Sequence, residues 1–314
     1  GYSYKSHLKI IYFATMSDIT YKTGFVAIVG KPNAGKSTLM NALVGERLSI
    51  ITNKAQTTRH RIMGIISGEN FQIVYSDTPG IIQPQYELQE NMMRFVHASL
   101  QDADLILWLV ELGEKMDTEL KLIHNISRAQ IPVILIINKI DLAKGTQLQD
   151  KLDYWEKQVA ETAVTEVVPV SALQQTNIDQ VMQAILNHLP EHPPYFPIDS
   201  LTDKPERFFA AEIIREKIFE NYKKEVPYSS EVVITEFKEE ENIIRIRAEI
   251  YVERKSQKGI LIGKQGSSLK KVGTEARLDM EQFFQKKVFL EQFVKVEPDW
   301  RKKREKLKRF GYSG

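Results

Sequence analysis

A stretch of eight residues near the amino end constrains the fold more than any other feature: Gly30-Lys31-Pro32-Asn33-Ala34-Gly35-Lys36-Ser37. It follows an apolar run of strand length and opens an amphipathic run of helix length. Its glycines let backbone N–H groups converge on an anion, and the helix N-terminus adds positive partial charge. Strand, glycine-rich turn and helix in this order predict a phosphate-binding loop on an α/β sheet.

The surrounding pattern alternates between short apolar runs and helix-length amphipathic runs, which predicts a doubly wound, mostly parallel sheet. The short link Ser67–Asn70 joins two runs directly and predicts a hairpin with one antiparallel edge strand. The expected strands are Phe25–Val29, Ile62–Ile66, Phe71–Ser76, Leu105–Val110, Val133–Ile137 and Glu166–Val170. The expected helices are Lys36–Val44, Gln85–Leu100, Thr118–Arg128, Thr146–Glu161 and Ile178–Leu189.

A proline-rich stretch, Leu189–Pro197, cannot be helical and predicts a semi-rigid linker. After it, the order α-β-β-α-α-β predicts a smaller α+β domain: helix Pro205–Lys224, strands Glu231–Phe237 and Ile243–Val252, helical region Gly259–Lys287 and strand Val288–Val296. We therefore expect a first domain of residues 16–189, a linker of residues 190–198, a second domain of residues 199–297 and a basic tail of residues 298–314. Residues 1–15 precede Met16 and are interpreted as an added or upstream extension, with a targeting peptide as the alternative.

Charge is divided unevenly along the 314 residues. Residues 1–198 hold 17 basic and 20 acidic side chains, and residues 199–314 hold 26 and 21; between Arg245 and Arg309 the counts are 19 and 9. The second part is therefore expected to meet a polyanion, the alternative being a well-solvated Lys/Glu surface. The lack of Cys excludes disulfides, thiol catalysis and Cys-based metal sites, and no apolar run is long enough for a membrane span.

Asp77-Thr78-Pro79-Gly80 follows the next apolar strand of the first domain. A carboxylate there can hold Mg²⁺, usually through water, and the Gly80 amide can meet a γ-phosphate. In the phosphate-binding loop, Lys36 is expected to reach the β- and γ-phosphates and the Ser37 hydroxyl to ligate Mg²⁺.

Asn138-Lys139-Ile140-Asp141 ends another core strand and predicts guanine recognition. A carboxylate accepts two hydrogen bonds from guanine N1–H and its 2-amino group, whereas adenine would leave it partly unpaired. Asn138 is expected to brace the neighbouring loops, the Lys139 stem to cover the base, and Ser171-Ala172-Leu173 to place the Ala172 amide on guanine O6.

In this order, these motifs resemble the translation-factor-like GTPases, and Ala55-Gln56-Thr57-Thr58-Arg59-His60-Arg61 is similar to switch I of Era-type GTPases. The resemblance implies a switch threonine on Mg²⁺, for which Thr58 is preferred and Thr57 stays open. The catalytic Gln of Ras-like enzymes is replaced by Ile81, which cannot position water by hydrogen bonding. Asn33 resembles the asparagine that holds K⁺ in cation-dependent relatives, the alternative being a simple turn residue.

These patterns together give the predicted nucleotide site. Its nucleotide-binding residues are Gly30, Lys31, Pro32, Asn33, Ala34, Gly35, Lys36, Ser37, Thr38, Asp77, Thr78, Pro79, Gly80, Asn138, Lys139, Asp141, Ser171, Ala172 and Leu173. Its catalytic residues are Lys36, Thr58, Gly80 and Asn33, and its metal ligands are Ser37, Thr58 and Asp77.

In the basic part, Gly263-Lys264-Gln265-Gly266 lies between two helical segments and resembles the G-x-x-G clamp of type II KH domains. Such a loop holds phosphates while an apolar groove takes about four unstacked bases; a glycine-rich turn in a basic helical hairpin is the alternative. The predicted RNA-binding residues are Lys258, Gly259, Ile260, Ile262, Gly263, Lys264, Gln265, Gly266, Lys270 and Lys271. The basic run Arg301–Arg309 is expected either to touch RNA or anionic lipid or to be a frayed helix end.

A GTPase domain followed by a type II KH domain is the arrangement of Era-type GTPases, and the resemblance spans about residues 16–310. It implies a GTP-hydrolysing switch that uses GTP, Mg²⁺ and K⁺, and a cytoplasmic monomer loosely associated with the inner membrane. It also implies binding to the 3′ end of small-subunit rRNA and a role in small-subunit assembly. A membrane-associated signalling GTPase and an RNA scaffold that barely hydrolyses GTP are the two alternatives.

Overall fold

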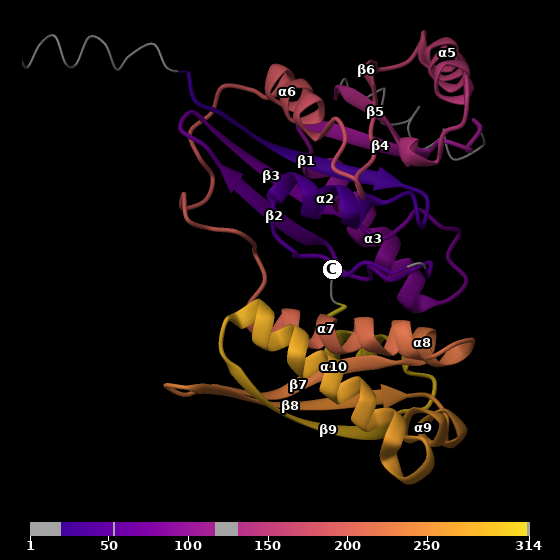
Figure 1. The fold of residues 1–314 in the computed structure, drawn as a ribbon, viewed down its shortest axis with the longest axis vertical. Helices are drawn as coiled ribbons and strands as arrows, with labels where there is room; N and C mark the ends of the chain where they lie inside the picture. Colours follow the sequence, from indigo (N-terminus) through magenta and orange to yellow (C-terminus); the bar gives the residue numbers. More distant parts are fainter. Residues whose placement is uncertain (1–19, 53, 117–130, 313–314) are drawn as a thin grey trace, which may run out of the picture.

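The computed structural model describes residues 20–52, 54–116 and 131–312, and its amino-terminal part is built on a six-stranded sheet (Figure 1). The strands lie in the order β2-β3-β1-β4-β5-β6. Neighbours pair in parallel except β2 and β3, which form the predicted antiparallel hairpin at the edge. The strands are β1 Lys22–Gly30, β2 Ile62–Ser67, β3 Phe71–Asp77, β4 Leu105–Glu111, β5 Val133–Asn138 and β6 Val164–Pro169.

Helices cover both faces of this sheet because its central strands are apolar on both sides. One face packs on α2 and α6 through residues such as Leu39 and Ile185, and the other packs on α3 and α5 through Val96 and Trp155. These helices are α2 Lys36–Val44, α3 Glu87–Asp102, α5 Gln147–Val159 and α6 Ile178–His188. The helix predicted over Thr118–Arg128 lies outside the described residues. The predicted α/β fold class is confirmed.

The carboxy-terminal part is a three-stranded sheet with helices against one face. The central strand β8 pairs antiparallel with β7 and parallel with β9. The predicted α-β-β-α-α-β order is present, with one unpredicted short helix, α8, inserted before β7. The elements are α7 Glu206–Asn221, α8 Glu225–Ser229, β7 Glu231–Glu239, β8 Ile243–Val252, α9 Lys255–Ile262, α10 Ser267–Phe284 and β9 Lys287–Val296.

The predicted helical region of residues 259–287 is two helices, separated by the short 3₁₀ turn η2, Lys264–Gly266. The first of them starts earlier than predicted, at Lys255. The reason is a cap: the Gln257 side-chain oxygen accepts hydrogen bonds from the amides of Glu253 and Arg254 at 3.0 and 2.9 Å, which satisfies N–H groups that a helix start leaves unpaired.

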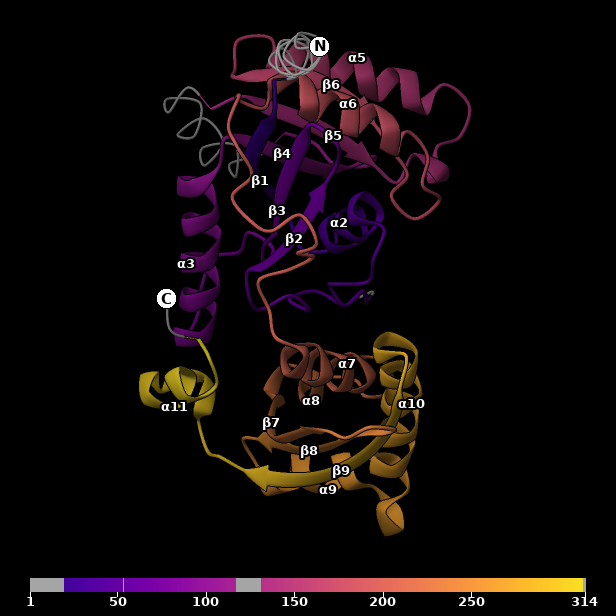
Figure 2. The ribbon, with the colours of Figure 1, turned by 90° about the vertical axis from the view of Figure 1, so that its left-hand side faces the viewer.

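The segment between α6 and α7 runs along the first sheet. The Gln72 side chain on β3 accepts hydrogen bonds from the amides of Tyr195 and Phe196 at 2.8 and 2.9 Å. Further along, the Ile65 amide on β2 donates to the Leu201 carbonyl at 2.8 Å. Hydrogen bonds to β2 and β3 therefore fix the path of the connection before it enters α7 (Figure 2).

The residues after β9, here called the C-terminal segment (residues 298–312), form the turn η3 Trp300–Lys302 and the helix α11 Arg304–Arg309. Figure 2 shows α11 next to the end of α3. Trp300, Leu307, Phe310 and Tyr312 are buried in one apolar cluster with Leu88 and Met92 of α3. The segment is thus anchored by burial, unlike the frayed end that was one of its predicted alternatives.

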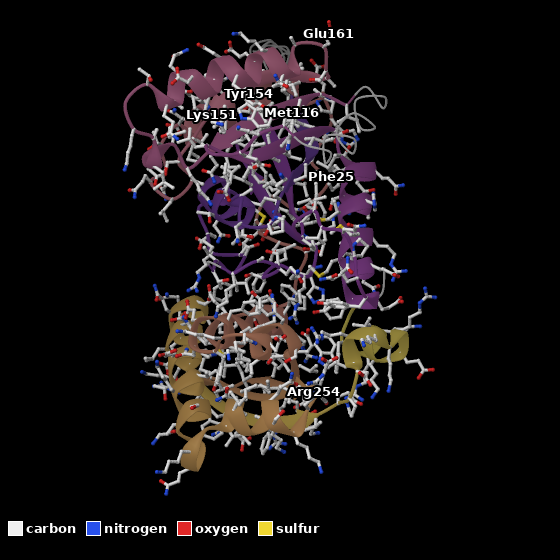
Figure 3. All side chains as sticks on the ribbon, turned by 90° about the vertical axis from the view of Figure 1, so that its right-hand side faces the viewer. Phe25, Met116, Lys151, Tyr154, Glu161 and Arg254 are labelled. Carbon is white, nitrogen blue, oxygen red and sulfur yellow. The ribbon has the colours of Figure 1, made fainter. Side chains whose placement is uncertain are left out.

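Side chains from the two sheet-and-helix units meet at their junction (Figure 3). His60 lies there, with its ring stacked on Tyr312 at a centroid distance of 4.4 Å and edge-on to Phe208 of α7 at 5.6 Å. Within the part of the chain that the structure describes, no helix has the length and hydropathy that crossing a membrane requires.

Candidate functional site

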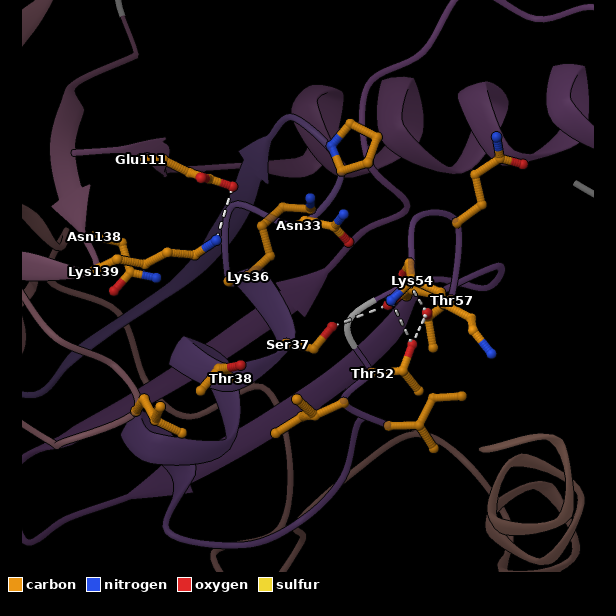
Figure 4. Close-up of a pocket in the computed structure, with 18 of the residues that line it drawn as sticks. Asn33, Lys36, Ser37, Thr38, Thr52, Lys54, Thr57, Glu111, Asn138 and Lys139 are labelled. Atoms are coloured by element: carbon orange, nitrogen blue, oxygen red, sulfur yellow. Dashed lines mark hydrogen bonds and ion pairs between the residues drawn. The ribbon is translucent and has the colours of Figure 1, made fainter. Parts of the chain in front are cut away.

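The predicted phosphate and base motifs meet around one cavity of about 560 Å³ (Figure 4). They do so because β1, β3, β5 and β6 are parallel, so the segments that follow them all lie at one edge of the sheet. The volume is in the range of small-molecule sites. Predicted residues that line it are Pro32, Asn33, Gly35, Lys36, Ser37, Thr38, Thr57, Thr58, Gly80, Asn138, Lys139, Asp141 and Leu173.

At the phosphate end, the Lys36 side chain is buried, with only 6% of its surface exposed. Its ammonium donates to the carbonyl oxygens of Gly30 at 3.1 Å and Lys31 at 2.8 Å, which holds it inside the loop. Burial lowers the pKa of Lys36 to about 8, against the opposing attraction of Asp77 and Glu114. The hydrogen bonds of this cation go to neutral carbonyl groups, so burial has removed its water without giving it a hydrogen-bonded counter-charge, and an incoming anion is favoured.

The predicted metal ligands Ser37, Thr58 and Asp77 lie side by side. The Ser37 hydroxyl donates to Asp77 Oδ2 at 2.7 Å and lies 3.0 Å from the Thr58 hydroxyl. Asp77 is fully buried, and burial raises the pKa of its carboxyl, with Ser37 and Lys36 opposing. Its other oxygen, Oδ1, makes no hydrogen bond of ordinary geometry to any described residue. Two hydroxyls and a buried carboxylate with an unused oxygen form a donor set that suits a hard divalent cation.

The two threonines that the sequence left open differ in orientation. The Thr57 hydroxyl donates to the Lys54 carbonyl at 2.7 Å and lies 2.6 Å from the Thr52 hydroxyl (Figure 4). The Thr58 hydroxyl points instead to Ser37. In this arrangement Thr58 lies with the predicted metal ligands, and Thr57 braces the loop.

Gly80 needs to be a glycine because a Cβ there would come within 2.7 Å of the Pro32 backbone nitrogen. The strand end and the phosphate-binding loop are therefore in direct contact, and the Ile81 amide donates to the Gly30 carbonyl at 3.1 Å. The Ile81 side chain packs against the core beneath α3 and α5. Thr78 is also turned inward, donating to the Ile28 carbonyl at 2.8 Å.

At the base end, Asn138 joins two loops. Its side chain donates to the Ala34 carbonyl at 2.8 Å and accepts from the Ala172 amide at 3.0 Å. The amide that the sequence assigned to guanine O6 is thus engaged by Asn138 in this structure. The Ser171 hydroxyl donates to Asp141 at 2.5 Å, which orients that carboxylate at the cavity. Lys139 forms an ion pair with Glu111 at 2.9 Å.

Sequence reasoning missed several residues of the cavity wall: Ile50, Ile51, Thr52, Lys54, Glu111 and Leu142. Most belong to the stretch before switch I, which has no regular hydrophobic period to place it. Lys54 had one available signal, its position next to the switch motif. Its ammonium donates to the carbonyl oxygens of Phe219 and Tyr222, where α7 ends, and a cation is favoured at that end of a helix.

The predicted RNA-binding loop lies at the far side of the second unit (Figures 1 and 3). Gly263 and Gly266 have φ of 73° and 78°, a backbone region that favours glycine. Lys264 and Gln265, between them, are exposed. Ile260 is 56% exposed whereas Leu261 is buried in the core, so one face of α9 presents an apolar side chain to solvent.

Comparison with known proteins shows which families the two units resemble. Residues 25–139 match the family described as 50S ribosome-binding GTPase, and residues 225–301 match the KH domain family. The GTPase Era of Syntrophus aciditrophicus (strain SB) is 47% identical over 298 residues, covering 94% of this chain and 96% of that protein. The chain belongs to the GTPase Era family.

Two solved Era structures share the whole arrangement. Era in complex with MgGDPNP and nucleotides 1506–1542 of 16S ribosomal RNA has a TM-score of 0.89 and 42% identity, covering 94% of this chain and 100% of that one. A variant of Aquifex aeolicus Era bound to GDP·AlF4⁻ has the same score and identity, covering 93% and 100%. The predicted resemblance to Era-type GTPases is confirmed, and the chain is a GTPase of this family.

Proposed function

We propose that this member of the GTPase Era family binds and hydrolyses GTP in the cavity described above and binds single-stranded RNA on its KH unit. The RNA proposed is the 3′ end of small-subunit rRNA, and the role is in assembly of the small ribosomal subunit. One observation carries the nucleotide part of the proposal: a single cavity joins the buried Lys36 and the half-buried Ser37 at one end to Asp141 at the other.

Each residue at the cavity has its own proposed role in GTP binding and hydrolysis. Lys36 neutralises charge on the β- and γ-phosphates, and the Gly80 amide donates to the γ-phosphate. Asp141 accepts from the guanine edge, with Ser171 holding its carboxylate in place. Ser37, Thr58 and Asp77 would hold Mg²⁺, which when bound would supply charge neutralisation at the phosphate oxygens. The Ile81 side chain is half-buried against the core and cannot hydrogen-bond water, so other groups must position the attacking water.

Asn33 is our candidate for a K⁺ ligand. Its side chain is exposed at the cavity wall, and its backbone has a φ of 66°. A monovalent cation beside the phosphates would add charge stabilisation of the kind an arginine finger gives. Hydrolysis should be faster in K⁺ than in Na⁺, and Asn33→Ala should remove that difference. Equal rates in the two salts would overturn this part of the proposal.

The decisive experiment is single-turnover GTP hydrolysis with and without single-stranded RNA that carries the 3′ end of 16S rRNA. We expect slow hydrolysis alone and about tenfold stimulation by RNA, which corresponds to lowering the barrier by about 1.4 kcal/mol. Gly263→Asp should abolish the stimulation and leave hydrolysis without RNA unchanged, since the loop is remote from the cavity. A wild-type protein that binds GTP without releasing phosphate would instead support the scaffold alternative.

Coupling between nucleotide and RNA is tested by binding alone. GTP is proposed to order the loops around Thr58 and Gly80 and so to favour the domain arrangement that binds RNA. The RNA Kd at fixed salt should be lower with a non-hydrolysable GTP analogue than with GDP. Identical Kd values in the two states would refute the coupling.

The C-terminal segment carries further basic side chains that a polyanion could contact. Several of its cations are already paired with acidic side chains: Arg301 with Glu253, Arg304 with Glu87, and Lys306 with Glu297. Lys302, Lys303 and Lys308 are exposed, and they are the proposed contacts for RNA phosphates or anionic lipid. Flotation with phosphatidylglycerol vesicles tests the peripheral membrane association, and light scattering tests the proposed monomer.

A further inference from the structure

Arg59, directly after Thr58, is anchored in the KH unit. Only 2% of its side chain is exposed. Its guanidinium donates to the carbonyl oxygens of Ser230 at 2.7 Å, Tyr228 at 3.0 Å and Pro227 at 3.3 Å, where α8 ends. It also donates to the Glu231 carboxylate at 2.9 Å. A planar fork with five donors is suited to such a set of acceptors.

Glu231 shares one carboxylate oxygen between two partners. Oε2 accepts from Arg59 at 2.9 Å and from the Tyr312 hydroxyl at 2.6 Å. Glu231 and Tyr312 are 4% and 2% exposed, so water does not replace a lost partner easily. If one partner of the buried Glu231 carboxylate is removed, no water takes its place, so the positions of the remaining partners are less well fixed.

Tyr312 is itself held from two sides. Its ring stacks on His60, the residue after Arg59, and its amide donates to the Leu307 carbonyl at 2.9 Å. Nearby, the Trp300 indole donates to the Ser229 carbonyl at 2.8 Å, and its ring lies 5.7 Å from the Arg59 guanidinium. The C-terminal segment, the start of β7 and switch I therefore form one buried network.

We propose that Tyr312 is a positioning residue for GTP hydrolysis: through Glu231 and Arg59 it fixes switch I so that the Thr58 hydroxyl stays beside Ser37 and Asp77. The inference rests on the proposed function of Thr58 at the metal site. One peptide bond separates Thr58 from Arg59, so movement of the anchored guanidinium shifts the backbone that carries the threonine. Arg59 and Glu231 are 172 positions apart in the sequence, and Glu231 and Tyr312 are 81 positions apart, so only folding brings the three residues together.

The test is Tyr312→Phe, which removes the hydroxyl and keeps the ring that stacks on His60. Tyr251→Phe is the matched control because Tyr251 lies in the same apolar cluster, but its hydroxyl donates to Glu249 and accepts from Arg309 at 2.8 Å, and neither partner bonds to Arg59 or Glu231. We expect kcat at saturating GTP to fall about fivefold in Tyr312→Phe and to stay unchanged in the control, with equal GDP affinity in both.

A double variant separates this role from a loss of stability. In the Glu231→Gln background, Tyr312→Phe should cause little further loss of kcat, because the hydrogen bonds that Glu231 accepts from Arg59 and Tyr312 are already weakened there. Fully additive losses, a kcat equal to that of Tyr251→Phe, or an increase in kcat would each overturn the proposal. Thr58→Ala measured in parallel tests the underlying function: if that variant keeps the wild-type rate, Thr58 has no role at the metal site, whatever Tyr312 does.

Discussion

The nucleotide cavity and the KH loop, the two proposed anion sites, differ in how their polar side chains are held. In the cavity, Lys36, Asp77 and Asn138 are 6%, 0% and 3% exposed, and each makes hydrogen bonds that fix its orientation before any ligand arrives. In the loop, Lys264 and Gln265 stand exposed between two glycines. Fixed, buried groups give strong and non-additive effects on binding, whereas an exposed cation such as Lys264 contributes separately and is screened by salt.

The largest effect expected from this contrast is that of Lys36→Ala. The substitution removes the buried ammonium that is proposed to neutralise the β- and γ-phosphates, so kcat for GTP should fall about a thousandfold. Single-turnover phosphate release measures it. Lys157→Ala, an exposed lysine on α5, is the control and should stay at the wild-type rate. A Lys36→Ala variant that keeps a tenth of the rate would show that the cavity is less preorganised than its geometry indicates.

Asp141→Asn should change which base is accepted. An amide cannot accept from both guanine N1–H and the 2-amino group, so GTP affinity should fall about a hundredfold. Xanthine has a carbonyl in place of that amino group, so XTP should bind the variant better than the wild type. Competition with a fluorescent GDP analogue measures both, with Asp153→Asn on the exposed side of α5 as the control. An unchanged ratio of GTP to XTP affinity would contradict the assignment.

The pH dependence of nucleotide affinity should follow the protonation state of the Lys36 side chain. Its pKa is lowered to about 8 by burial, so in the free protein it is mostly charged at pH 7 and mostly neutral at pH 9. Phosphates bind the charged form, so above pH 8 binding must take up a proton and the affinity falls by up to about tenfold per pH unit. Lys36→Arg stays charged throughout and should give a flatter profile between pH 7 and 9. Equal slopes for the two proteins would contradict the role of this lysine.

The smallest effect is expected for a substitution in the KH loop. Lys264→Ala should weaken RNA binding about threefold at moderate salt and reduce the slope of log affinity against log salt by about 0.7, the value for one phosphate contact on a single strand. Lys287→Ala, 77% exposed at the start of β9, should leave both unchanged. GTP hydrolysis without RNA should be normal in both variants, and any loss there would break the separation of the two sites.

Much of the nucleotide site could be predicted because its motifs are local. Gly30–Ser37, Asp77–Gly80 and Asn138–Asp141 each follow an apolar strand, and parallel strands bring those ends together regardless of the detailed packing. For the switch threonines, resemblance alone favoured Thr58 and left Thr57 open, since neighbouring residues of the same type differ only in what they meet after folding. The Ala172 amide likewise has a partner, Asn138, that no local pattern indicates.

The sequence by itself determined the fold class, the chemistry of the ligand and the order of the two units, because strand and helix periods and short motifs act over a few residues. Only the tertiary structure decided that Arg59 forms an ion pair with Glu231 and that the Tyr312 hydroxyl donates to the same carboxylate. Such contacts depend on which side chains two large surfaces bury together. Burial makes each of them consequential, because a charge removed from water must find its partners within the protein.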